Sequence, residues 1–150
     1  MNRRNLIQGS VLAATAWAAL SAHAAADMAG HANHNMAGPS SALLNLAAAT
    51  GDCVVRGEAC LSHCLMLLGM GQNDMAPCAT SVNQLLAACT ALQKLALQDS
   101  PHTARMAAVV GQICADCEKE CRKHEGKHEQ CKACAVACAE CVKACKQVAA

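Results

Sequence analysis

Five cysteines repeat at helical spacing near the end of the chain, and this repeat limits how the chain can fold. Residues 131–145 read CKACAVACAECVKAC, so the five thiols follow one another at intervals of 3, 4, 3 and 4 residues. Because an α-helix turns once in about 3.6 residues, this spacing places all five along one face of a helix. Leucine usually occupies that face. The sequence therefore predicts a helix whose core-facing side is made of sulfur.

The aromatic residues that usually fill a core are missing. The chain of 150 residues has no Phe and no Tyr, and its single Trp, Trp17, lies in an N-terminal segment that we expect to be removed. The 13 cysteines, together with alanine and leucine, must fill the interior, and alanine and leucine strongly favour helix. A chain of this length supports one domain with one core. We therefore expect a single all-α domain.

The first 26 residues have the composition of an export signal. Two arginines at positions 3 and 4 precede an apolar run over about residues 11–20, and a small-residue site, AHA, follows at 22–24. This order is typical of a secretory signal, and the apolar run is too short to span a bilayer. RRNLI also resembles a twin-arginine signal, which exports folded proteins; an ordinary secretory signal is the alternative. We expect residues 1–26 to be removed and the protein to be exported, to a bacterial periplasm.

The charge of the mature chain argues against two classes of partner. Removal of the signal leaves 10 basic and 11 acidic residues, a net charge of −1 with neutral histidines. Such a chain has no basic field for nucleic acid or for an anionic membrane. It also has no aromatic side chains on which bases stack. We expect no nucleic-acid partner and, after signal removal, no membrane partner.

Glycine, proline and helix-capping residues divide the remainder into a flexible leader, residues 27–40, and a bundle, residues 41–150. The first helix is expected from Ser40 or Ser41 to about residue 68, with a break at Gly51 and Asp52 as an alternative. A loop over 69–77 leads to a second helix over about 77–97. The third helix is expected over about 101–124, with Ser100 as its cap. After a turn at 124–129, the fourth helix extends to about residue 147.

Four helices joined by short connections predict an up-down-up-down four-helix bundle with a cysteine-lined core. Several cysteines fall at the end that holds the loops 69–77 and 124–129, and we expect Cys64 and Cys78 to open to solvent there. Hydrocarbon is expected to close the other end. Its predicted members are Leu43, Leu46, Leu92, Leu95, Met106 and Val110.

So many thiols indicate metal binding more than packing. Ten of the 13 cysteines stand in C-x2-C or C-x3-C relationships, and neighbouring Cβ atoms on a helix, about 5–6 Å apart, are too distant for an unstrained disulfide. Thiolates favour Cu(I), Zn(II) or iron–sulfur clusters. Each four-thiolate zinc site keeps two negative charges, and several such sites in one narrow core would repel one another. One Cu(I) per thiolate leaves the core neutral. Iron–sulfur clusters need four cysteines at one point, and this pattern spreads them along an axis. Charge balance therefore favours Cu(I), and binding of zinc at low occupancy is an alternative.

The sequence resembles the bacterial copper storage protein family, more closely its exported members. The segments that carry the resemblance are residues 60–64 (CLSHC), residues 114–121 (CADCEKEC) and the five-cysteine stripe. The resemblance covers residues 41–148 approximately. It implies reversible storage of many Cu(I) ions, about one per core cysteine, in bundles that commonly form homo-oligomers. By the motif match, all the cysteines are implied as ligands, less securely Cys53, Cys78 and Cys89, which have no partner nearby in sequence. The implied ligands are Cys53, Cys60, Cys64, Cys78, Cys89, Cys114, Cys117, Cys121, Cys131, Cys134, Cys138, Cys141 and Cys145.

Thioethers and imidazoles near the end with the loops 69–77 and 124–129 are candidate ligands for copper uptake. They are Met66, Met70, Met75, His124 and His128. Ordinary apolar contacts for the methionines and a solvated turn for the histidines are equally weighted alternatives. His63 is offset from the cysteine stripe by one residue, so we expect it on the surface.

No grouping of a cysteine with a base and an orienting side chain stands out, and no strand pattern accompanies a C-x-x-C, so an enzyme is not expected. We expect a Cu(I) storage protein that hands copper to an acceptor protein. A thiol redox buffer or oxidoreductase and a zinc-storage bundle are the alternatives. Exposed alanine-rich faces with Ala133, Ala137 and Ala144 would let bundles pack together, although small residues also suit any tight helix pair.

Overall fold

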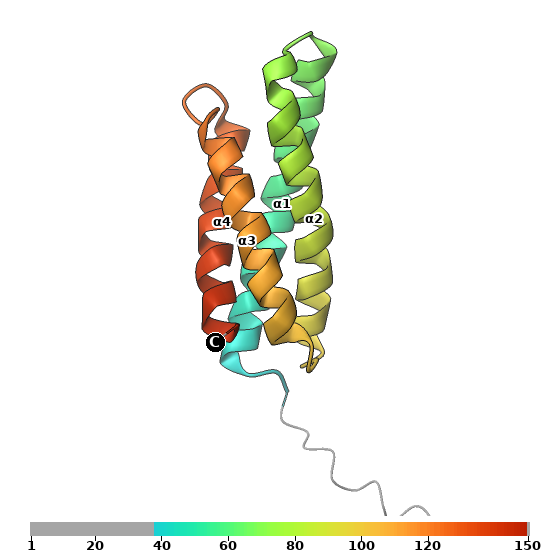
Figure 1. Ribbon diagram of the computed structural model, residues 1–150, viewed down its shortest axis with the longest axis vertical. Coiled ribbons are helices and arrows are strands. Elements are labelled where there is room, and N and C mark those ends of the chain that lie inside the picture. Colours follow the sequence, from blue (N-terminus) through green and yellow to red (C-terminus); the bar gives the residue numbers. More distant parts are fainter. Residues whose placement is uncertain (1–37, 150) are drawn as a thin grey trace, which may run out of the picture. The chain divides into compact units, whose positions relative to one another are not determined.

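The structure, a computed structural model, describes residues 38–149 and consists of a four-helix bundle (Figure 1). The expected signal peptide and residues 27–37 of the expected leader lie outside the described residues. No strand occurs in residues 38–149, so the predicted all-α class is confirmed. The helices are α1 (Ser41–Gly69), the 3-10 turn η1 (Asn73–Met75), α2 (Ala76–Leu97), α3 (Thr103–Arg122) and α4 (Glu129–Val148).

The four helices alternate in direction and form a ring. Each helix packs against two neighbours, in the order α1, α2, α3, α4 and back to α1. The α1–α2 and α3–α4 connections lie at one end, called here the mouth end, and the α2–α3 connection lies with the C-terminus at the other, the far end (Figure 1). This is the predicted up-down-up-down topology. Within the described part of the chain, no helix is long and apolar enough to cross a bilayer.

Helix α1 begins as predicted, and the predicted alternative of a break inside it is wrong. The Ser40 hydroxyl accepts a hydrogen bond from the Leu43 amide at 3.3 Å, which caps the helix. The helix then continues through Gly51 and Asp52 to Gly69. The packing of α2 explains why a glycine is tolerated there, because a Cβ at Gly51 would lie only 2.5 Å from the Gln93 amide nitrogen. That nitrogen donates instead to the Ala47 carbonyl at 3.1 Å, so glycine allows a side chain of α2 to reach the backbone of α1.

Helix α3 begins two residues later and ends two residues earlier than predicted. Pro101 lies in a turn and not in the helix. The Ser100 hydroxyl accepts from the amide of His102 at 3.3 Å, while the Thr103 hydroxyl donates to the Ser100 carbonyl at 2.8 Å. Ser100 therefore stabilises the turn that precedes the helix.

The far end is closed by hydrocarbon as predicted, with one adjustment. Leu46, Leu92 and Val110 are fully buried. Leu43, Leu95 and Met106 are only partly buried, and Ala107 takes the fully buried position beside Met106 on α3.

The expectation that α4 exposes an alanine face is wrong. Ala137 is 3% exposed and Ala144 is 9% exposed, and Ala133 is half-buried. Helix α4 packs against both α1 and α3, so residues on both sides of its cysteine stripe are covered. Ala137 and Ala144 belong to the core and therefore offer no surface to another bundle.

Candidate metal centre

All the cysteines lie inside the bundle, and none forms a disulfide. Twelve have no exposed surface, and Cys145 is 1% exposed. Each helix contributes some of them: three from α1, two from α2, three from α3 and five from α4. The predicted orientation of the five-cysteine stripe toward the core is therefore confirmed.

The thiols gather in four groups, in each of which the Sγ atoms lie within 4.8 Å of one another. The mouth group consists of Cys60, Cys64, Cys78 and Cys131, and the deep group, which shares no residue with the others, consists of Cys53, Cys89, Cys114 and Cys141. Two smaller groups share Cys134, and the first of them also shares Cys60 with the mouth group: Cys60, Cys121 and Cys134, and Cys117, Cys134 and Cys138. Cys145 extends the deep group, with its Sγ 3.9 Å from that of Cys141.

Tertiary packing gives partners to the three cysteines that have none nearby in sequence. Cys53 and Cys89 join the deep group, to which each of the four helices contributes one thiol. Cys78 joins the mouth group. The expectation that ligands only spread along the axis is incomplete, because four thiols converge at two places. The spacing within one helix cannot reveal such convergence, which depends on how neighbouring helices are offset along the bundle.

The distances between thiols suit shared metal ions. Sγ atoms are separated by 3.6 Å between Cys78 and Cys121 and by 3.7 Å between Cys89 and Cys114. A disulfide bond is about 2.05 Å long, so these pairs are not bonded. Two sulfurs that each contact one ion at about 2.3 Å are at most about 4.6 Å apart. The observed pairs lie inside that limit without movement of a helix.

Hydrogen bonding between thiols gives neighbouring cysteines different pKa values. In the deep group, the hydrogen bond with Cys114 lowers the pKa of Cys53 to about 6 and that of Cys141 to about 5. The same contact with Cys141 raises the pKa of Cys114 above the ordinary thiol value. The deep group thus places thiols that ionise readily beside one that keeps its proton.

A second set of thiols repeats this pattern. Cys117 lowers the pKa of Cys134 and raises the pKa values of Cys121 and Cys138. In the mouth group, Cys131 lowers the pKa of Cys64. Each region therefore combines thiols of lowered and raised pKa, and the thiolate is the form of cysteine that binds metal ions.

The mouth end is more closed than the sequence predicts. Cys64 and Cys78 have no exposed surface, so the expectation that they open to solvent is wrong. Leu67, one turn beyond Cys64, is 6% exposed, and Met75, three residues before Cys78, is fully buried. These two apolar side chains belong to the same core cluster and close this end.

The remaining candidate uptake ligands divide into a histidine set and two exposed methionines. His63 Nε2 lies 3.0 Å from His128 Nδ1, and the ring of His124 lies 6.4 Å from that of His128 between centroids. His63 is therefore half-buried and paired, not free on the surface as expected, because its side of α1 faces the start of α4. Met66 and Met70 are 54% and 70% exposed.

The fold and the thiol groups together define a class: closed helical bundles with a cysteine-lined interior, whose donor atoms are those that soft metal ions prefer. A family profile described as copper storage protein matches residues 40–150. The chain belongs to the copper storage protein family.

Three relatives agree with this assignment. An uncharacterized cysteine-rich protein of Bacillus subtilis, YhjQ, is 31% identical over 99 residues, which are 66% of this chain and 88% of that protein. The apo structure of copper storage protein 3 from Bacillus subtilis is 30% identical with a TM-score of 0.62, over 70% of this chain and 96% of that one. A cytosolic copper storage protein from Streptomyces lividans with five coppers is 26% identical with a TM-score of 0.67, over 72% of this chain and 92% of that one.

Proposed function

We propose that this protein stores Cu(I), with many cuprous ions bound by the core cysteines and none used in catalysis. One observation carries the proposal: every one of the 13 cysteines is buried, and all but Cys145 belong to groups of three or four thiols with Sγ atoms within 4.8 Å. The proposed ligands are all 13, including Cys53, Cys78 and Cys89. The Streptomyces relative with five coppers supports storage of several ions in one bundle.

Charge balance favours the monovalent ion. In residues 38–149 the core contains cysteines, aliphatic residues, alanine, Gly57 and Met75, and the only buried polar side chains there are those of Thr50 and Thr103. No buried cation among the described residues offsets a row of thiolates, so the metal itself must supply the positive charge. One Cu(I) per thiolate leaves the core neutral. A dry sulfur core also keeps Cu(I) away from water and oxygen, which makes storage protective.

Zinc storage is the second candidate, and a specific observation favours it. The mouth group and the deep group each supply four thiols, the number that a tetrahedral Zn(II) site requires. Two such sites lie within the capacity of the bundle, whereas the smaller groups offer only three thiols each. The two functions therefore differ in the number of ions that the protein binds.

Anaerobic titration of the reduced protein, with a competing chelator present, tests the proposal. We expect Cu(I) binding to continue to about one ion per thiol with no change in helical circular dichroism, because the bundle is already formed. Zn(II) is expected to saturate at about two ions. Saturation by Cu(I) at only a few ions would contradict storage and favour zinc sites. Reversible loss of free thiols without metal would also contradict storage and would favour a redox function.

We also propose that copper enters the core at the mouth end through the paired histidines. His63 and His128 bridge α1 and the start of α4 beside the mouth group, and imidazole binds Cu(I) more weakly than thiolate does. His124, Met66, Met70 and the buried Met75 are further candidates in the same path.

Replacement of both paired histidines by alanine is expected to slow Cu(I) loading about tenfold. The number of ions bound at equilibrium should stay unchanged, because the thiols are intact. Stopped-flow absorbance of the Cu(I)–thiolate bands measures the rate, and His102→Ala, an exposed histidine at the far end, is the matched control. Equal loading rates in the double variant and the control would show that the pair has no part in uptake.

Export and assembly complete the proposal. Residues 1–26 would direct a folded protein out of the cytoplasm, residues 27–40 would form a leader, and residues 41–150 would form the bundle. An acceptor protein would receive the copper, and several copies of the bundle would assemble. Any such assembly would use a surface other than the buried alanines of α4.

A further inference from the structure

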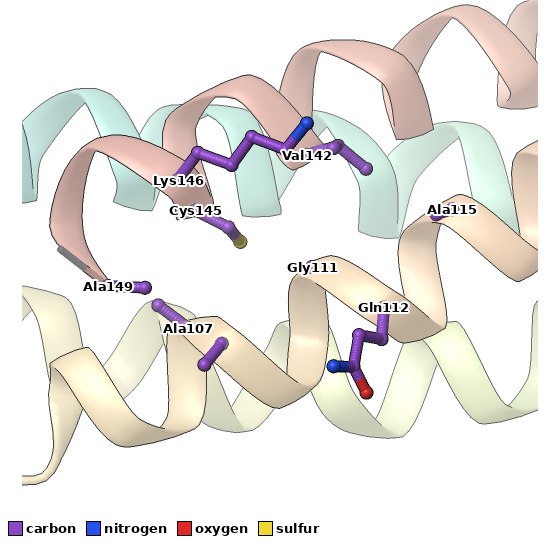
Figure 2. A pocket seen from close by; sticks show the side chains of 9 residues that line it. Ala107, Gly111, Gln112, Ala115, Val142, Cys145, Lys146 and Ala149 are labelled. Carbon is purple, nitrogen blue, oxygen red and sulfur yellow. The ribbon is translucent and has the colours of Figure 1, made fainter.

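A groove on the surface between α3 and α4 lies beside the C-terminal turns of α4 (Figure 2). It is therefore at the far end, whereas the histidine pair lies where α4 begins, at the mouth end. Its cavity volume is about 240 Å³. The residues that line it include Ala107, Ala108, Gly111, Val142, Cys145 and Lys146. Its walls are almost entirely apolar, and it reaches the one core thiol that is not fully covered.

Cys145 forms the floor of the groove. It is the only cysteine of the chain with any exposed surface, 1%, whereas the other twelve have none. Its sulfur points from α4 toward α3, across the position of Gly111 (Figure 2). A Cβ at Gly111 would lie 3.2 Å from the Cβ of Cys145, so glycine lets α3 pack close to α4 beside this thiol.

This thiol connects the groove to the core. Cys145 Sγ lies 3.9 Å from Cys141 Sγ, and Cys141 belongs to the deep group with Cys53, Cys89 and Cys114. An ion that moves from Cys141 to Cys145 therefore reaches the surface in one step. It passes neither the mouth group nor the histidine pair.

The size and the lining of the groove indicate what it admits. A volume of about 240 Å³ holds roughly eight waters, and pockets for drug-sized ligands begin at about 300 Å³. The lining is almost entirely apolar, and the Lys146 side chain runs along α4 with its ammonium turned away from α3 (Figure 2). A small uncharged molecule fits this groove, and a helix or loop of another protein does not.

We propose that the groove is a second port of the copper store, at which a low-molecular-weight uncharged thiol takes Cu(I) directly from Cys145. This inference rests on the proposed Cu(I) storage function. The incoming thiol binds the Cu(I) held between Cys141 and Cys145, the bond from copper to Cys145 breaks, and the proton of the incoming thiol passes to Cys145. A second thiol displaces Cys141 in the same way. Copper stays in the +1 state, and the products are two protonated cysteines and a Cu(I) bis-thiolate with the same net charge as the site.

Selective alkylation of the metal-free protein tests access to Cys145 without copper. We expect iodoacetamide under limiting conditions to label Cys145 at least tenfold faster than Cys138, a fully buried thiol of the same helix, as measured by peptide mass spectrometry. Ala108→Phe, which fills the groove from an exposed position, should abolish this preference. Ala91→Phe, at an exposed position of α2, is the matched control and should preserve it. Equal labelling of Cys145 and Cys138 in the unsubstituted protein overturns the port.

Copper release tests the exchange itself. The Cu(I)-loaded protein is mixed anaerobically with 2-mercaptoethanol, and the released Cu(I) is trapped by a bulky external chelator. We expect Ala108→Phe to slow thiol-dependent release at least fivefold. Release that is unchanged in Ala108→Phe, or that is abolished by the His63→Ala/His128→Ala variant, overturns the proposal. If the unsubstituted protein binds only a few Cu(I) ions in the titration, the storage function itself is overturned, and with it the exchange step.

Discussion

Loading the reduced protein with Cu(I) is expected to raise its unfolding temperature by at least about 20 °C. Ligands that bind only the folded state stabilise it by mass action, by about 4 kcal/mol for each site at a thousand times its dissociation constant. Two such sites would add about 8 kcal/mol, and a domain of roughly this size gains about 3 °C for each kcal/mol. The bundle has thiol groups for more than two ions, so about 20 °C is a lower expectation. Thermal melts followed by circular dichroism under anaerobic conditions measure the shift.

A variant that lacks the deep group is the control for this prediction. Replacement of its four cysteines by alanine removes the ligands that join all four helices and leaves the mouth group and both smaller groups intact. We expect this variant to bind fewer ions and to gain clearly less in unfolding temperature than the unsubstituted protein. An unfolding temperature that does not respond to Cu(I) in the unsubstituted protein would show that the ions do not hold the helices together.

The face that each helix turns toward the core could be predicted from the sequence because it depends on local spacing. The intervals of 3 and 4 residues in the stripe place its cysteines on one face of α4, and all five are buried there. Ser40 marks the start of α1 for the same reason, because a cap acts within one turn. The sequence is rich in alanine and leucine and has no Phe or Tyr, so a core built by packed helices could be predicted from composition.

What the sequence did not predict depends on contacts between helices. The convergence of Cys53 and Cys89 with cysteines of α3 and α4 requires the rotation and axial offset of all four helices, which spacing within one helix does not contain. The burial of Ala137 and the pairing of His63 with His128 have the same origin, since both face a neighbouring helix. The continuity of α1 through Gly51 depends on a side chain of α2. Each of these errors concerns a residue whose neighbour lies far away in the sequence, whereas the two-residue errors in the bounds of α3 are local.

The metal-free protein is expected to depend on the few large aliphatic side chains of its core. A thiol buries less apolar area than leucine, and apolar burial contributes about 25 cal/mol for each Å². The largest fully buried aliphatic side chains besides Met75 lie on three helices: Leu46 on α1, Val82, Leu85 and Leu92 on α2, and Val110 on α3. These residues should therefore supply most of the stability of the bundle before copper binds.

Leu92→Ala is accordingly expected to lower the free energy of unfolding of the metal-free protein by about 2–5 kcal/mol, a large part of the total of about 5–15 kcal/mol usual for a domain. Leu97→Ala, at a 51% exposed position of the same helix, is the matched control and should change it by less than about 0.5 kcal/mol. Urea unfolding followed by circular dichroism measures both. Cu(I) should restore much of the stability that Leu92→Ala removes, because the ions crosslink the same four helices through the thiols of the deep group. An equal, small effect of the two substitutions would mean that the cysteines themselves stabilise the metal-free core.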